Sequence, residues 1–507
     1  MITMTTMTRT QTDIMPVEIL RIGNPWMIGP NAGRIAPLYV LHNVITGRYK
    51  GHLSPRVPRL KDLAFHADTA FSEPDPAKSI DQAFSVNSSE YDLLQRTVFG
   101  LGAPERRIFK DRTNNGADNS GRLFPFIFDL AETTGSDDSL GLRLRALIDS
   151  VDPEVQQRIF DLINNSETTN DPCTNFIRTV IGSSAATATS AVVPPPSAND
   201  AGRASVPRAE FDTHCVKFIA NLLENGSSGE RISSIRRLAW GCYFIAIMQL
   251  VTGPSVRLAG HTGELPLVMA FGDLPPGSTS DASAELASKS FVAWANASYR
   301  ATAGMMARQF EKVTVVGHQT SPRLQQLRDA LAWDSSGEPR IPQNPVGGRL
   351  DKLSKIPGAM TTSDWCHAIM EHDVLAFGAA EWRRRLRVLC NKIGFAAPER
   401  GATTKLVFDT PLLEVIVSGI AGSTTMTFQE FVDALAYRFG LVVGPGSDGV
   451  LADRLKRSIG DPGDTEHTLR INEDQLRRRL LRVGLARAHS DSHTTVAGAD
   501  FEGPSNV

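Results

Sequence analysis

The chain lacks the features that mark secreted, membrane-spanning or disulfide-built proteins. Its 507 residues include only five cysteines, which are odd in number and never spaced as C-x-x-C, arguing against a disulfide scaffold or a zinc ribbon. The opening residues, MITMTTMTRTQTD, contain no apolar segment of the kind that a secretory signal needs. The longest apolar run, Leu238 to Val251, is shorter than the ~20 residues that cross a bilayer and predicts a buried core helix. We therefore expect a cytoplasmic protein of bacterial type that makes no membrane contact.

An excess of charge of either sign is also absent. The chain has 53 Lys and Arg residues against 55 Asp and Glu residues, a formal net charge of -2. This balance excludes a protein that coats nucleic acid along its whole length, so any such contact must come from a local basic surface. A hydrophobic content of 41% and a charged content of 21% are ordinary for a soluble globular protein, and the length allows two to four domains.

Motifs for catalysis are incomplete. His367, Glu371 and His372 share one segment, but their spacing has one residue too many for the H-E-x-x-H or H-x-x-E-H zinc motif. The glycine-rich segments 419–424 and 444–449 lack the lysine that a P-loop places on phosphates. The protein is therefore more likely not an enzyme, and neither a cofactor nor a metal ion is expected.

Two changes in composition divide the chain. Residues 182–207 are rich in Ala, Ser, Thr and Pro and almost uncharged, and residues 335–358 carry four prolines and few large apolar residues. Both are predicted to be linkers. The expected parts are a mixed α+β N-terminal region at 1–181, the linker 182–207, a helical middle domain at 208–334, the linker 335–358, and a helical C-terminal region at 359–500.

Hydrophobic periodicity predicts an α+β fold that is mainly α-helical and multidomain. In the first region, Val17 to Ile28 and Phe124 to Leu130 have strand character, whereas Asp152-Pro153 starts a helix. In the middle region, helical patterns cover 210–224, 232–251 and 282–313, with a strand at 266–271.

The C-terminal region has the clearest pattern. Helices are predicted at Asp409 to Ala421, after the Thr427–Glu430 capping box, and from an N-cap at Asn472 to Gly484. A strand at 424–426 precedes the second helix, and a hairpin with its turn at Ser490 to Ser492 follows the third. This order predicts a winged-helix-like module at 409–498, with one departure: residues 441–471 stand where a tight turn is expected.

The third helix of this module carries the candidate site. Its apolar residues Leu476, Leu480 and Val483 predict a core face, and its basic residues lie opposite. Arginines on a groove-facing helix bind phosphates and can pair with guanine. The candidate nucleic-acid-binding residues are Gln475, Arg478, Arg479, Arg482, and, on the hairpin, Arg487 and His489. A solvated helix face, or a surface that binds protein, is the alternative.

A second basic run lies on the predicted helix that begins near Trp382. It comprises Arg383, Arg384, Arg385, Arg387 and Lys392. These charges are spread around the helix, so they cannot all face one ligand, and a solvated face is the favoured interpretation.

The segments WRRRLRVLCNKIGFAAPERGATTKLVFDTPLLEVIVSGI, TMTFQEFVDALAYRFGLVVG and NEDQLRRRLLRVGLARAHSDSHTTVAG resemble the C-terminal part of uncharacterised accessory proteins. Such proteins are encoded beside ATPases, methyltransferases and kinases in bacterial antiphage defence operons, including the methylation-associated kind. The resemblance covers Trp382 to Gly498 and supplies no catalytic residue. It implies a role in antiviral defence with one of these operon-encoded proteins as a partner.

The sequence thus predicts a non-catalytic accessory subunit that binds duplex DNA, or a partner bound to DNA, through its C-terminal module. Two alternatives stay open. The first is a protein-protein adaptor or scaffold without nucleic-acid contact. The second is a metal-dependent nuclease whose site lies in the first region, near Asp129 or Glu132.

Overall fold

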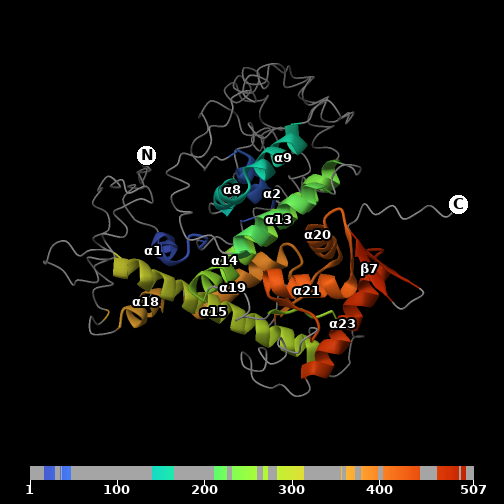
Figure 1. The fold of residues 1–507 in the computed structure, drawn as a ribbon. Coiled ribbons are helices and arrows are strands. Elements are labelled where there is room, and N and C mark those ends of the chain that lie inside the picture. The colour runs from blue at the N-terminus through green and yellow to red at the C-terminus, as the bar shows by residue number, and fades with distance from the viewer. Residues whose placement is uncertain are drawn as a thin grey trace, which may run out of the picture.

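The computed structural model describes residues 16–28, 35, 37–46, 140–164, 210–224, 231–259, 267–271, 282–312, 356, 361–371, 378–397, 404–445, 465–489 and 493–497. This part of the chain is mainly helical, with a few short strands. Figure 1 shows the long helices α13, α14 and α15 crossing the middle of the molecule, with α20, α21, α23 and β7 on one side and α18 on the other.

The helices and strands have the following bounds. The helices are α1 (Pro16–Gly23), α2 (Pro37–Thr46), α8 (Leu140–Val151), α9 (Pro153–Asn164), α13 (Glu210–Glu224), α14 (Arg231–Ala259), α15 (Ala282–Lys312), α18 (Thr362–Glu371), α19 (Ala379–Asn391), α20 (Thr410–Ala421), α21 (Phe428–Phe439) and α23 (Thr465–Arg482). The strands are β1 (Leu267–Val268), β2 (Ala396–Ala397), β3 (Lys405–Leu406), β4 (Thr425–Thr427), β5 (Leu441–Val442), β6 (Ala486–Ala488) and β7 (Thr494–Ala497).

Helix α14 is the central core helix. It packs against α2, α8, α13, α15 and α20, and its residues from Leu238 to Val251 are buried, apart from the half-buried Trp240. By length and composition the segment Ser234–Ala259 could cross a membrane, but most of it is buried inside the fold. The predicted helix at 232–251 is therefore confirmed, and it extends two turns further, through Pro254, to Ala259.

Aromatic side chains join the middle and C-terminal regions. The Phe439 ring of α21 lies 5.6 Å, centroid to centroid, from both Phe218 of α13 and Phe244 of α14. Phe244 in turn lies 5.4 Å from Phe395, which follows α19. One main core cluster accordingly contains residues from all three regions predicted from the sequence, from Leu20 to Val496. The predicted linkers fall outside the described residues, apart from the buried Ile356.

A parallel pair of strands makes a second link between these regions. Strand β1 pairs with β5, so that Leu267 lies opposite Leu441 and Val268 opposite Val442. A small cluster of buried residues surrounds this pair, including Leu286 of α15 and Leu469 of α23. The strand predicted at 266–271 is thus confirmed as a short one, and it holds the segment between α21 and α23 against the middle region.

Two predictions of local structure are wrong. Residues 17–28 form helix α1 and the turn after it, because Gly23 packs so closely on α15 that an added Cβ would lie 2.2 Å from the Thr302 carbonyl oxygen. This packing overrides the strand preference of its β-branched residues. Asn472 is not an N-cap but a fully buried residue inside α23, which begins at Thr465. Its amide group bonds to other backbone segments instead of to its own helix.

Gly394, in the turn after α19, is expected to tolerate substitution poorly. Its φ is +71°, and an added Cβ would lie 2.0 Å from the carboxyl group of Asp409. That carboxylate caps α20 by accepting the Leu412 amide at 2.8 Å. We expect Gly394→Ala to lower the free energy of unfolding by about 2–4 kcal/mol, because left-handed backbone strain and loss of the cap add together.

The matched control for Gly394 is Gly484, measured by chemical denaturation. Gly484 has a similar φ of +77° but no atom within 4 Å of an added Cβ, so Gly484→Ala should cost only the strain of about 1–2 kcal/mol. Equal losses for the two variants would show that the contact with Asp409 contributes nothing.

Candidate nucleic-acid interface

The last part of the described chain folds as three helices around a small antiparallel sheet, here called the C-terminal unit (residues 410–445, 465–489 and 493–497). Its order is α20, β4, α21, β5, α23, β6 and β7, and the sheet order is β4-β7-β6, whereas β5 pairs with β1. Met426 of β4 lies opposite Val496 of β7, and Arg487 of β6 lies opposite Thr495. The β6–β7 hairpin and the two predicted helices before α23 are therefore confirmed, whereas the turn at 490–492 lies outside the described residues.

Local sequence explains where these helices begin and end. The hydroxyl group of Thr427 accepts the Glu430 amide at 3.2 Å, while the Glu430 carboxylate accepts the Thr427 amide at 2.7 Å. This reciprocal capping box starts α21, and Gly440, with a φ of +69°, ends it. These bonds stabilise the charged form of Glu430 and lower the pKa of its carboxyl group.

The predicted site residues on helix α23 differ in their exposure to solvent. Leu476 and Leu480 are buried, which confirms the predicted core face. Arg478 is exposed, with 78% of its side chain accessible. It pairs with Asp474 at 2.7 Å. Arg482 is also exposed and lies one turn further along. These two arginines are adjacent on the outer surface, so both can reach a ligand that lies along the helix.

The other two predicted residues on α23 lie at the boundary of the core. Gln475 and Arg479 are half-buried, and the Oε1 atom of Gln475 is buried without a hydrogen-bond partner. Arg479 lies close enough to the α20 cap to lower the pKa of Asp409, whose burial raises that pKa by a larger amount. Arg479 is half-buried and is therefore less available to a ligand than Arg478.

Two predicted site residues lie on the hairpin, Arg487 in strand β6 and His489 directly after it. Both Arg487 and His489 are exposed. An imidazole nitrogen of His489 lies 2.9 Å from the Thr495 hydroxyl group, which fixes the ring against β7. Across α23 and the described part of the hairpin there are six arginines and three carboxylates, a local positive excess that the whole chain lacks.

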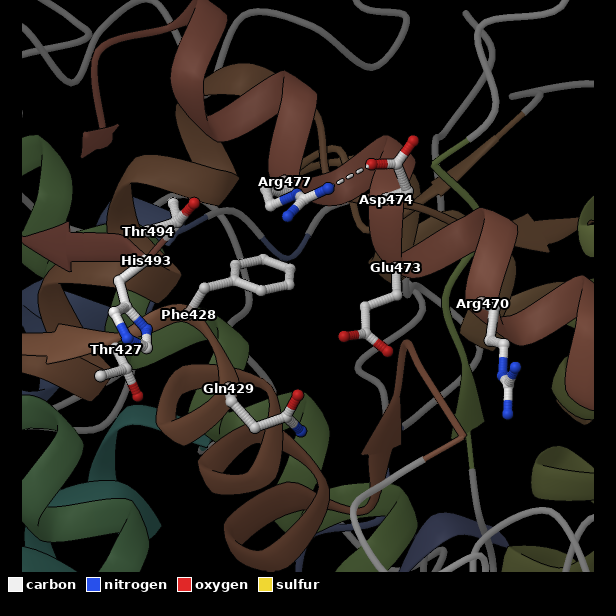
Figure 2. A pocket seen from close by; sticks show the side chains of 9 residues that line it. All are labelled: Thr427, Phe428, Gln429, Arg470, Glu473, Asp474, Arg477, His493 and Thr494. Atoms are coloured by element: carbon white, nitrogen blue, oxygen red, sulfur yellow. Dashed lines mark hydrogen bonds and ion pairs between the residues drawn. The ribbon is translucent and has the colours of Figure 1, made fainter. Parts of the chain in front are cut away.

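A hollow of about 510 Å³ lies beside this basic surface, between α21, α23 and β7. Figure 2 shows Phe428 of α21 and Glu473 of α23 pointing into it, with Arg477 and the hairpin residue His493 nearby. Its lining residues are Thr427, Phe428, Gln429, Arg470, Glu473, Asp474, Arg477, His493 and Thr494. The sequence did not predict this site, because its walls come from segments that only the fold brings together.

Two arginines of the second basic run are paired within their own helix. Arg384 donates two hydrogen bonds of 2.6 Å to the Glu381 carboxylate, and Arg385, which is buried, donates another at 2.8 Å. The hydrogen bond from Arg384 is the largest of the effects that lower the pKa of Glu381 to about 2. These arginines therefore form no open basic surface.

The other candidate sites of the sequence have little support in the described residues. Within them, no group of three or more His, Cys, Asp or Glu side chains is arranged to hold a metal ion, and His372, Asp129 and Glu132 lie outside them. Cys215 is fully buried, which raises the pKa of its thiol and disfavours the nucleophilic thiolate.

Comparison of the chain with protein-family models, with curated proteins and with solved structures returns no match.

Proposed function

We propose that this protein is a non-catalytic accessory subunit of a bacterial antiviral defence system, and that its C-terminal unit is a winged-helix-like module that contacts duplex DNA or a DNA-bound partner. A cytoplasmic location belongs to the same proposal. So does association with an ATPase, methyltransferase or kinase encoded in the same operon, which rests on the resemblance of residues 382–498 to accessory proteins of such operons.

The observation that carries the proposal is the pairing of β4 with β7. It brings the start of α21, the exposed side of α23 and the β6–β7 hairpin to one end of the molecule (Figure 1). Winged-helix DNA readers use a helix in the groove and a neighbouring hairpin on the backbone. In this chain Arg478 and Arg482 occupy the helix position, and Arg487 occupies the hairpin position.

The ion pair between Arg478 and Asp474 is compatible with phosphate binding. It joins two residues on the surface of one helix, and exposed pairs of this kind contribute only about 0.3–0.5 kcal/mol. A phosphate can therefore displace the carboxylate at little cost. The backbone of the turn that carries Asp474 is anchored by the buried Asn472, whose side chain bonds to Met269, Phe271 and Val443.

Binding of full-length protein to a duplex oligonucleotide across a salt series tests the proposal. The whole chain is needed because β1, α13 and α15 pack against the C-terminal unit. We expect log K to fall linearly with log salt concentration, by ~0.9 for each phosphate contacted. No binding at low salt would reject nucleic-acid contact.

The adaptor alternative has a structural observation in its favour, namely the hollow beside α23. Association with an operon-encoded partner that does not depend on salt, together with no DNA binding, would support an adaptor. The nuclease alternative concerns Asp129 and Glu132, which lie outside the described residues.

A further inference from the structure

The Glu473 carboxylate is the unusual group in the hollow. The side chain is half-buried, and within the described part of the chain it makes no hydrogen bond or ion pair. It rests on the backbone of Gly444, where an added Cβ would lie 2.0 Å from the Glu473 Oε2 atom. Burial, and then the nearby Asp433, raise the pKa of Glu473. A carboxylate held in this way is incompletely satisfied and would gain from a cationic partner.

The arginines on the rim do not fill that role. Arg477 donates a hydrogen bond to Asp474 at 2.8 Å, and Arg470 pairs with Glu466 at 2.5 Å. Both arginines lower the pKa of Glu473 only through their more distant charges. The hollow is lined by two carboxylates, Glu473 and Asp474, and two guanidinium groups, Arg470 and Arg477, so Glu473 is the lining charge left without an ion-pair partner among the described residues.

The shape and charge of the hollow disfavour DNA as its occupant. Glu473 is half-buried between α21 and α23, and its own carboxylate, which forms no ion pair within the described residues, would repel a phosphate. A long side chain that ends in a cation can reach into the hollow and is attracted by the Glu473 carboxylate. The Phe428 ring is 8% exposed and lines the hollow, so its accessible part offers an apolar wall for a planar guanidinium group whose N–H groups meet the carboxylate (Figure 2).

We propose that the hollow between α21, α23 and β7 is a docking site for an arginine side chain from a basic segment of a partner protein, with Glu473 as its counter-ion and Phe428 as its stacking wall. This site is separate from the proposed DNA contact at Arg478 and Arg482. The protein would then hold DNA on the outer side of α23 and a protein partner beside it. The two proposals can fail independently.

The test uses full-length protein and a fluorescently labelled, alanine-rich peptide that carries arginines, with polarisation as the measurement. The same peptide with citrulline, which has the shape of arginine without its charge, is the ligand control. We expect citrulline to weaken binding at least about tenfold, since charge-assisted bonds are roughly twice as strong as neutral ones. Equal binding of the two peptides, or no binding of the arginine peptide, would overturn the proposal.

Two glutamine variants locate the effect. Glu473→Gln should weaken binding of the arginine peptide about tenfold and abolish its advantage over citrulline. Glu311→Gln removes the same charge from an exposed position on α15, outside the hollow, and should leave binding unchanged. Equal losses in both variants would indicate attraction to the general charge of the surface and would reject the site. DNA binding by Glu473→Gln should persist, which separates this proposal from the DNA contact.

Discussion

Replacing Asn472 by leucine is expected to lower the free energy of unfolding by about 3–6 kcal/mol, because three buried backbone groups lose their partners. The side-chain amide donates to the carbonyl oxygens of Met269 at 2.6 Å and Val443 at 2.8 Å. Its oxygen accepts the Phe271 amide at 2.9 Å. One side chain thereby ties α23 to the strands that precede α15 and follow α21, and leucine has a similar size but no polar group.

Chemical denaturation of the full chain measures this loss, and the adjacent residue supplies the control. Ile471 is 46% exposed, so Ile471→Ala should change the free energy of unfolding by no more than about 0.5 kcal/mol. A comparably small effect of Asn472→Leu would show that these three hydrogen bonds do not hold α23 in place.

Replacing Arg257 by methionine is expected to cost about 3–5 kcal/mol, because a buried charge loses its counter-ion. The Arg257 guanidinium lies 3.1 Å from the Asp212 carboxylate and donates to the Gln249 amide oxygen at 2.7 Å. Gln249 also donates to Asp212 at 2.8 Å, which closes the network between α13 and α14. Only 10% of the Arg257 side chain and 6% of the Asp212 side chain are exposed.

A double variant distinguishes the loss of the counter-charge from the loss of packing. Asp212→Asn combined with Arg257→Met removes both charges, so it should destabilise the protein less than Arg257→Met alone. The midpoint and slope of urea unfolding give the free energy of unfolding of each variant. A double variant that is less stable than the single one would contradict this explanation of the network.

Local patterns in the sequence predicted much of the helical structure correctly. Helix α13 has the predicted bounds, the helix predicted at Asp409 to Ala421 is found at Thr410–Ala421, and the Thr427–Glu430 box is confirmed, because each depends on residues within a few positions of one another. Asn472 shows the limit of such patterns. An asparagine before two acidic residues resembles an N-cap, but its partners lie at 269, 271 and 443, and no local rule contains them.

The sequence likewise predicted only part of the candidate site. The outward position of Arg478 and Arg482 follows from helical periodicity around Leu476 and Leu480. The half-burial of Arg479 does not, because it depends on the tertiary packing of α23. The hollow needs Phe428 and Glu473 brought together and a glycine at 444 that leaves room for the Glu473 carboxylate, and this arrangement is a product of tertiary folding.

The central claim is that the outer side of α23 binds DNA, and one comparison of duplex DNA affinity across a salt series tests it most directly. Arg478→Ala with Arg482→Ala should weaken binding about tenfold or more and reduce the slope of log K against log salt by about 1.8, since each phosphate contact contributes ~0.9. Arg383→Ala with Arg384→Ala removes the same charge from α19 and should leave the affinity and the slope unchanged. Unchanged affinity and slope in the α23 variant would contradict the claim.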